Sequence, residues 1–201
     1  MRIVVRCVGV LVCLLAMLGG SKSGAASSGK TLGKPDAPIR IELFSDYQCP
    51  SCKVFHEQTL KPLIADYVNT GKVYLVFREF PLVTIHPHAR EAACLACAAD
   101  MIGKYEQVAD QLFSTQQKWV ADGDVAGAAC RILSPADAKK VTELAKSPEI
   151  AQRVDGEMRL GQNEKVNGTP TMIITRMIRR YPISGPVSFT VLSKFLDSLV
   201  N

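Results

Sequence analysis

Residues 44–60 read FSDYQCPSCKVFHEQTL and contain two cysteines, Cys49 and Cys52, that are separated by two residues. The segment just before them, 39–45, alternates apolar and polar residues and then becomes apolar, which predicts a strand. After the cysteines, apolar residues recur at helical spacing as far as residue 68. The pair therefore lies at a strand-to-helix turn, where it could be a metal clip, a structural disulfide or a reacting pair.

The position of the pair at the expected helix start favours a reacting pair. Cys49 would precede the helix, Pro50 would occupy its first position, and Cys52 would lie about one turn inside. Free N–H groups at a helix start favour negative charge, so the pKa of Cys49 should lie below that of a free cysteine. Cys52 would be more buried and less favoured as an anion. One sulfur could then attack while the other resolves a mixed disulfide, as thiol–disulfide exchange requires.

The two other interpretations remain as alternatives. An inert disulfide is compatible with the CxxC spacing alone. A metal site would need more ligands, and a second pair, Cys94 and Cys97, is present. However, 41 residues separate the two pairs, against roughly 15–20 in a zinc ribbon. The second pair also lies in a helix-forming alanine run.

The remaining pattern predicts an α/β protein with a helical block in its middle. Residues 73–80 read as a second strand, stopped by Pro81, and this completes a βαβ unit. Pro62 lies inside the intervening helix and is expected to kink it. The other expected elements are helices at 88–102, 104–120, 135–146, 148–165 and 188–200, a strand within 166–175 and a second strand at 178–183.

The N-terminus resembles a secretory signal peptide. Two arginines precede a short apolar run at residues 7–18, and small residues follow it. We expect cleavage after Ala26; the alternative is an uncleaved membrane anchor. The formal charge of +5 comes from 24 Lys+Arg and 19 Asp+Glu, and removal of residues 1–26 takes away three cations, leaving 21 − 19 = +2. This charge is too small to argue for a nucleic-acid partner.

A distant motif, GTPT at residues 168–171, points to a family. Together, FSDYQCPSC and NGTPTMII resemble the thioredoxin-fold thiol–disulfide oxidoreductases, and FREFPL…HPHAREAA, residues 77–93, is similar to the DsbA-like branch with its helical insertion. The resemblance covers roughly residues 31 to 200. It implies a thioredoxin-like fold built from βαβ and ββα halves around a central sheet. It also implies that the bond before Pro170 is cis and that Thr169 and Pro170 shape a groove for a substrate peptide.

Several residues around the two cysteines are candidates for supporting roles. Pro50 and Ser51 should tune the redox potential, and Ser51 differs from the histidine that the strongest oxidants of this branch carry. Asp46 could relay a proton near Cys52 or could cap the turn, and Glu42 is a rival for the relay. His56, one turn past Cys52, is interpreted as a solvated helix residue rather than a base.

Five cysteines remain after removal of the expected signal peptide, and the compartment is expected to be oxidising. Cys94 and Cys97 share a face of their expected helix, and Cys130 lies on a neighbouring one. A disulfide from Cys130 to one of them would join the helices of the block. The alternative is three buried free cysteines that behave as small apolar groups.

The sequence thus predicts an exported thiol–disulfide oxidoreductase of the cell envelope or periplasm, most simply a DsbA-like oxidase. Its partners would be unfolded or reduced proteins and a membrane redox partner; no cofactor, metal or nucleic acid is expected, and the protein should be a monomer. A reductase or isomerase and a cysteine-based metal-binding module are the alternatives. The expected parts are a signal peptide at 1–26, a leader at 27–38, a thioredoxin-like domain at 39–82 and 166–201, and an inserted helical domain at 83–165.

Overall fold

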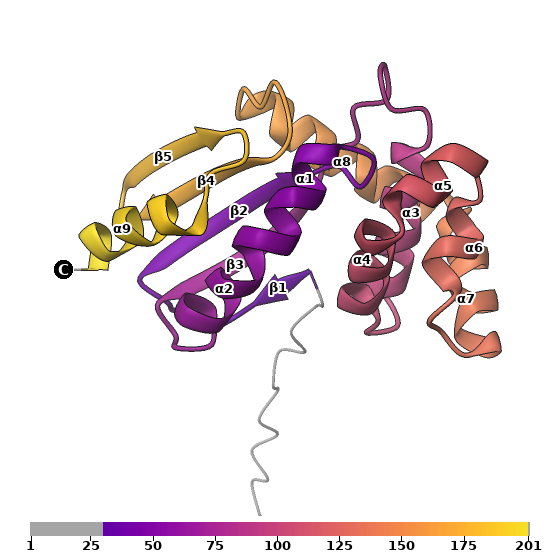
Figure 1. Ribbon diagram of the computed structural model, residues 1–201, viewed down its shortest axis with the longest axis horizontal. Coiled ribbons are helices and arrows are strands. Elements are labelled where there is room, and N and C mark those ends of the chain that lie inside the picture. The colour runs from indigo at the N-terminus through magenta and orange to yellow at the C-terminus, as the bar shows by residue number, and fades with distance from the viewer. Residues whose placement is uncertain (1–29, 201) are drawn as a thin grey trace, which may run out of the picture.

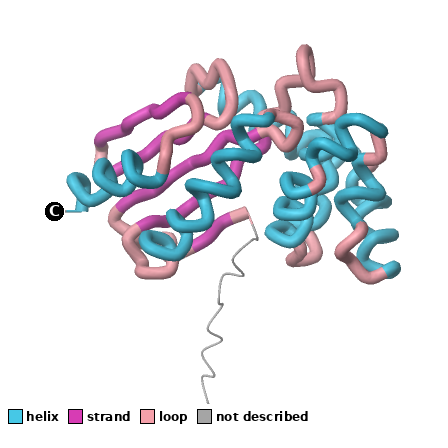
Figure 2. Tube along the Cα trace, in the orientation of Figure 1, coloured by secondary structure: helices cyan, strands magenta, loops and turns pink. Residues whose placement is uncertain are grey.

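The computed structural model describes residues 30–200, and the predicted signal peptide lies outside these residues (Figure 1). The described chain combines a twisted sheet with a block of helices beside it (Figure 2). No described helix is both long enough and apolar enough to span a membrane.

The sheet has five strands in the order β1-β3-β2-β4-β5. Strands β2 and β3 are parallel, and the other pairs are antiparallel. Two residues of the expected leader form the edge strand β1, because their backbone pairs with β3. The strands are β1 Thr31–Leu32, β2 Ile39–Ser45, β3 Val73–Glu79, β4 Thr171–Arg176 and β5 Arg179–Ser184.

One face of the sheet is covered by the helix that follows the cysteine pair and by the C-terminal helix α9, Phe189–Val200 (Figure 1). The first of these continues past Pro62 without a break. Pro62 lacks a backbone N–H and so cannot donate a helical hydrogen bond. The hydrogen bonds on both sides of it follow the π-helical i→i+5 pattern instead of the α-helical one. The segments are α1 Pro50–Phe55, η1 His56–Leu60, α2 Lys61–Leu63 and η2 Ile64–Val68.

The opposite face of the sheet carries Phe44 and Ile173 against Phe80 and the end of α8. This contact requires a glycine, since a Cβ added at Gly161 would lie 2.5 Å from the Phe80 ring. The close approach joins the helical block to the sheet.

The helical block has its own core, rich in alanines of α3 that leave room for neighbouring helices. Ser134 and Ser147 cap their helices through side-chain oxygens that accept from Asp137 and Ile150 N–H groups. The single helix expected at 104–120 is two helices, with Thr115 between them. The block comprises α3 Ala89–Asp100, α4 Tyr105–Ser114, α5 Gln116–Asp122, α6 Val125–Cys130, α7 Pro135–Ala145 and α8 Pro148–Asn163.

Candidate active site

The cysteine pair lies at the turn between the end of β2 and the start of α1. Cys49 is the N-cap residue with extended backbone angles of −74° and 121°, and Pro50 is the first helical residue. The Cys49 carbonyl accepts from the backbone N–H groups of Cys52 and Lys53 at 3.1 and 3.2 Å. Cys49 keeps 7% of its surface exposed, whereas Cys52 keeps 1%. The outer sulfur is therefore the one that a partner can reach first.

The two sulfurs have opposite electrostatic environments. A hydrogen bond from the Cys52 thiol, reinforced by the backbone N–H groups of Ser51 and Cys52, lowers the pKa of Cys49 to about 5 despite partial burial. Burial raises the pKa of Cys52 well above its usual value, and the neighbouring Cys49 thiolate raises it further. The arrangement supports one thiolate and one thiol at neutral pH.

The loop before β4 closes the site from the other side. The Thr169–Pro170 peptide bond is cis, as the resemblance implied. The Cys49 Sγ lies 3.4 Å from the Thr169 carbonyl oxygen. The Thr169 Oγ1 is buried beside the two sulfurs. The Cys49 sulfur and the Thr169 carbonyl and hydroxyl groups thus lie close together.

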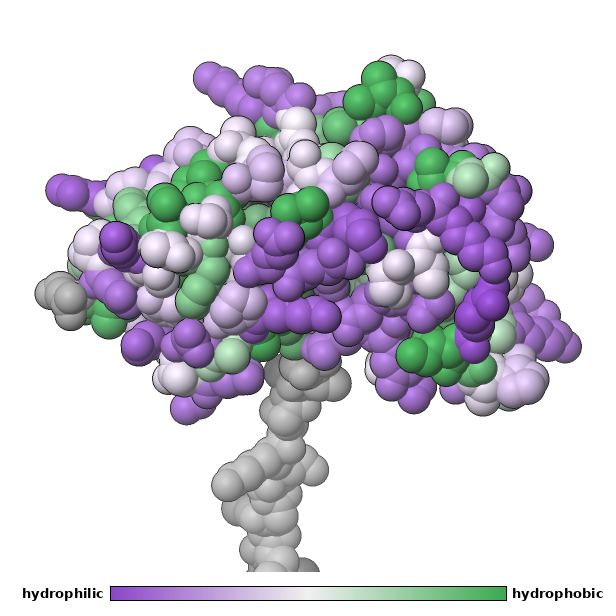
Figure 3. Space-filling model, viewed as in Figure 1, coloured by the Kyte–Doolittle hydropathy of each residue, from purple (hydrophilic) through white to green (hydrophobic). Residues whose placement is uncertain are grey.

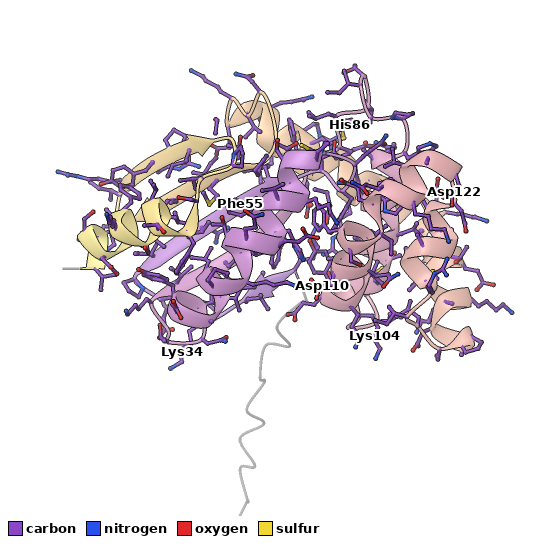
Figure 4. The ribbon with its side chains drawn as sticks, viewed as in Figure 1. Lys34, Phe55, His86, Lys104, Asp110 and Asp122 are labelled. Carbon is purple, nitrogen blue, oxygen red and sulfur yellow. The ribbon has the colours of Figure 1, made fainter. Side chains whose placement is uncertain are left out.

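Neither of the two expected proton relays contacts Cys52 by a hydrogen bond. Asp46 is 1% exposed and caps the turn: one oxygen accepts from the Gln48 N–H at 2.7 Å. Its other oxygen binds the Leu82 N–H at 2.8 Å and the His86 Nδ1 at 2.7 Å. Asp46 therefore holds the loop after β3, on which Figure 4 labels His86. Glu42 is engaged elsewhere on the sheet, with the guanidinium groups of Arg78 and Arg40.

The loop that Asp46 holds presents apolar side chains beside the site. Val83 and Ile85 are 46% and 67% exposed. A hydrophobic group stands at the top of the surface in Figure 3, where Figure 1 shows the loop between β3 and α3.

The helical block reaches the cysteine loop through residues that the sequence did not single out. The buried Gln116 amide donates to the carbonyls of Tyr47 and Cys49 at 2.6 and 3.0 Å. Lys53, one residue after Cys52, donates to the Phe113 carbonyl at 2.7 Å. A glutamine in a polar stretch of sequence carries no signal of such a contact.

A buried charge cluster between β3, α3 and α8 was also missed. Lys30 Nζ lies 3.2 Å from a Glu79 oxygen, 2.6 Å from a Glu157 oxygen and 3.5 Å from the Cys97 sulfur. Burial raises the pKa of Glu79 to about 7, although Lys30 opposes the shift. The ligand atoms of Glu79, Cys97 and Glu157 lie close enough together to hold a metal ion. In this structure, however, the Lys30 ammonium lies among them and supplies the positive charge that balances the carboxylates.

The structure contains no disulfide among the five cysteines it describes, so the expected bridge from Cys130 is absent. The Cys97 sulfur faces Lys30 inside the charge cluster, whereas the Cys130 sulfur contacts the Ala138 carbonyl and the Thr142 hydroxyl of α7. Cys94 and Cys130 are half-buried and Cys97 is buried. In this structure Cys94, Cys97 and Cys130 are therefore free cysteines, as in the alternative to a disulfide.

The metal interpretation of the CxxC pair lacks further ligands. The one cluster of three or more potential ligands found within residues 30–200 contains neither Cys49 nor Cys52. Their nearest polar neighbours are Thr169, Ser45 and backbone N–H groups. This environment fits thiol chemistry better than a closed tetrahedral site.

Comparisons with known proteins agree with this geometry. Residues 26–198 match the family model described as Thioredoxin. The probable disulfide bond formation protein D of Bacillus anthracis is 27% identical over 164 residues, which cover 77% of this chain and 73% of that protein.

Solved structures show the same fold. The thioredoxin-like oxidoreductase from Silicibacter pomeroyi has a TM-score of 0.68 at 27% identity, covering 84% of this chain and 90% of that one. Wolbachia pipientis alpha-DsbA1 has a TM-score of 0.71 at 20% identity, covering 85% and 89%. The chain therefore belongs to the thioredoxin family and is a DsbA-like thiol–disulfide oxidoreductase.

Proposed function

We propose that this protein is an exported oxidase that transfers the Cys49–Cys52 disulfide to reduced substrate proteins. The observation that carries the proposal is the asymmetry of the two sulfurs, with the pKa of Cys49 lowered to about 5 and that of Cys52 raised. A stabilised Cys49 thiolate favours the reduced form, and a disulfide whose reduced form is stable is a strong oxidant.

The proposed reaction has two exchanges. A substrate thiolate attacks the Cys49 sulfur, the Cys49–Cys52 bond breaks, and Cys52 leaves and takes up a proton. A second substrate thiolate then attacks the substrate sulfur of the mixed disulfide, which forms the substrate disulfide and releases Cys49 as a thiolate. In reoxidation Cys49 is the nucleophile toward the partner disulfide, and Cys52 resolves the mixed disulfide.

The neighbouring residues receive supporting roles. Pro50 and Ser51 shape the helix start whose N–H groups stabilise the thiolate. Thr169 and Pro170 form one wall of a groove for an extended substrate peptide, next to the Cys49 sulfur. The exposed Val83 and Ile85 extend this groove with apolar surface that an unfolded chain can cover.

Export and partners complete the proposal. The arginines and apolar run within residues 1–26 support a signal peptide and a periplasmic or cell-envelope location. A membrane redox partner would reoxidise the pair, and the protein would act as a monomer. We infer two domains, a thioredoxin-like domain at 39–82 and 166–201 and an inserted domain at 83–165, because the buried apolar residues fall mainly into separate clusters in the sheet and in the helical block.

The equilibrium of the purified protein with glutathione tests the oxidase assignment. We expect a reduction potential above about −200 mV, in the range of disulfide-forming proteins. The Cys94→Ser variant is the control and should have the same potential. A value near −270 mV, about that of thioredoxin, would contradict the oxidase and support a reductase.

A further inference from the structure

Cys52 must exchange a proton during the proposed reaction, yet its thiol is almost fully enclosed. It gains a proton when the substrate attacks Cys49, and it must lose one before it attacks the mixed disulfide during reoxidation. Only 1% of its surface is exposed, and burial raises the pKa of its thiol. This inference rests on the proposed function, because the proton transfer matters only if the pair reacts.

A cavity of about 120 Å³ extends from Cys52 between the sheet, the helix after the pair and α4. Its volume is sufficient for several water molecules. Leu43 and Ser45 of β2 and Phe77 of the adjacent strand β3 form the sheet side of its wall. That side of the cavity therefore offers no carboxylate, and polar groups come from Ser45, beside the Cys52 thiol, and from the two facing helices.

His56 forms part of the wall of this cavity, one helical turn after Cys52. Its backbone N–H donates to the Cys52 carbonyl, which places both side chains on the same side of the helix. The ring packs on Phe113 of α4 with centroids 4.5 Å apart. Its Nε2 lies 2.6 Å from Asp110 Oδ1. Figure 4 shows Asp110 at the front of the molecule, between α4 and the helix after the pair.

The His56–Asp110 pair defines which ring nitrogen can accept a proton. The hydrogen bond from His56 lowers the pKa of Asp110, so this carboxyl is ionised at neutral pH. An ionised carboxylate can only accept, so His56 Nε2 donates, and the neutral ring keeps its lone pair on Nδ1. The Asp110 side chain is 62% exposed and the His56 side chain 12% exposed, which connects the pair to solvent.

The two tyrosines that line the cavity are poor proton acceptors. Burial raises the pKa of Tyr47 and of Tyr105 well above the usual value, so both are neutral donors. Glu79 lies behind them, within 3.5 Å of both hydroxyls, in the Lys30 cluster. The remaining charged groups that face His56 are Glu57 and Lys61 on its own helix and Glu106 and Asp110 on α4.

We propose that His56, held by Asp110, is the proton acceptor and donor for Cys52 through this cavity. In reoxidation the Cys52 proton passes to His56 Nδ1, by way of the Ser45 hydroxyl or water in the cavity. The Cys52 thiolate attacks the Cys49 sulfur, the bond from Cys49 to the partner sulfur breaks, and the partner leaves as a thiolate. In substrate oxidation the imidazolium returns a proton to Cys52 as it leaves. Asp110 is a positioning residue.

Rapid mixing of the reduced protein with oxidised glutathione separates the two steps. The first forms the Cys49–glutathione mixed disulfide, and the second is the attack by Cys52; acid quenching and mass spectrometry measure each. At pH 6–7 we expect His56→Gln to slow the second step at least about tenfold, a modest part of what general bases contribute, and to leave the first step within about twofold. The wild-type second step should level off as pH rises, whereas that of the variant should keep rising.

Two further variants separate proton transfer from a structural effect. In His56→Ala, added imidazole should restore the second step by accepting the proton in place of the ring. Asp110→Asn keeps the ring on Phe113 but removes the carboxylate, so it should slow the second step less than His56→Gln does. The control is His88→Gln, the same change outside the cavity.

The outcomes are distinct. A second step in His56→Gln equal to that in His88→Gln would overturn the inference, as would slowing without a changed pH profile or imidazole rescue. If the wild-type protein formed no mixed disulfide on Cys49, the proposed function would fail at the first step and this inference with it.

Discussion

The chain contains the same cysteine spacing twice on helices, with opposite chemical consequences. Cys49 lies at the N-cap of α1, where the hydrogen bond from the Cys52 thiol, helped by free backbone N–H groups, lowers its pKa to about 5. Cys94 and Cys97 lie inside α3, where the N–H groups already serve the helix, and burial raises the pKa of both thiols. The same spacing gives a nucleophile only at the helix start, where the Cys52 thiol and free backbone N–H groups both stabilise the Cys49 thiolate.

Replacement of single cysteines should show the largest difference between the two pairs. We expect Cys49→Ala to lower disulfide-exchange activity by at least about a thousandfold, since loss of a nucleophile is among the largest effects of a single substitution. Cys52→Ala should accumulate mixed disulfides with partner proteins, because the resolving thiol is gone. The matched variants of the second pair, Cys94→Ala and Cys97→Ala, should do neither. Non-reducing gels of cells that export each variant measure this; equal trapping by both pairs would contradict the comparison.

The stability of the reduced protein should depend on pH through Cys49. The folded pKa of about 5 lies below the value of about 8.5 for a free cysteine. The stabilisation is therefore fully present above the unfolded pKa and is lost as pH falls through the folded value. Each pKa unit is worth about 1.4 kcal/mol, so a loss of a few kcal/mol is expected between pH 9 and pH 4.

Urea unfolding of the reduced protein measures this effect. The contribution of Cys49 is the difference in the free energy of unfolding between the wild type and Cys49→Ser at each pH. Cys94→Ser is the control and should show no comparable pH-dependent difference. A constant difference for Cys49→Ser across the range would show that its thiolate is not stabilised.

The smallest expected effect concerns the link from the helical block to the active pair. Gln116→Leu leaves the buried carbonyls of Tyr47 and Cys49 without the amide, which should cost about 1–3 kcal/mol of folding free energy. The exposed neighbour offers the matched change Gln117→Leu, which should be neutral. The thiolate absorbance of reduced Gln116→Leu should also titrate differently from that of the wild type. Identical titration would show that the helical block does not position Cys49.

Local patterns predicted most elements because their causes are local. The strand at 39–45 follows from apolar alternation and the strand at 73–80 from an apolar run that ends before Pro81. The helix starts at Ser134 and Ser147 follow from side-chain caps next to prolines. The break at Thr115 and the edge strand β1 were not predicted. Strand β1 exists because β3 offers it a partner, and a two-residue strand has no periodicity of its own.

The sequence by itself determined the βαβ order, the place of Cys49 at a helix start and the motif that contains Pro170, since each depends on neighbours within a few positions. Only the tertiary structure decided what surrounds these residues. It directs Asp46 to His86 rather than to Cys52, places Lys30 among Glu79, Glu157 and Cys97, and brings His56 to Asp110. The physical reason is that hydrogen bonds and charges in a core act over a few ångströms in space, between side chains that can be far apart along the chain.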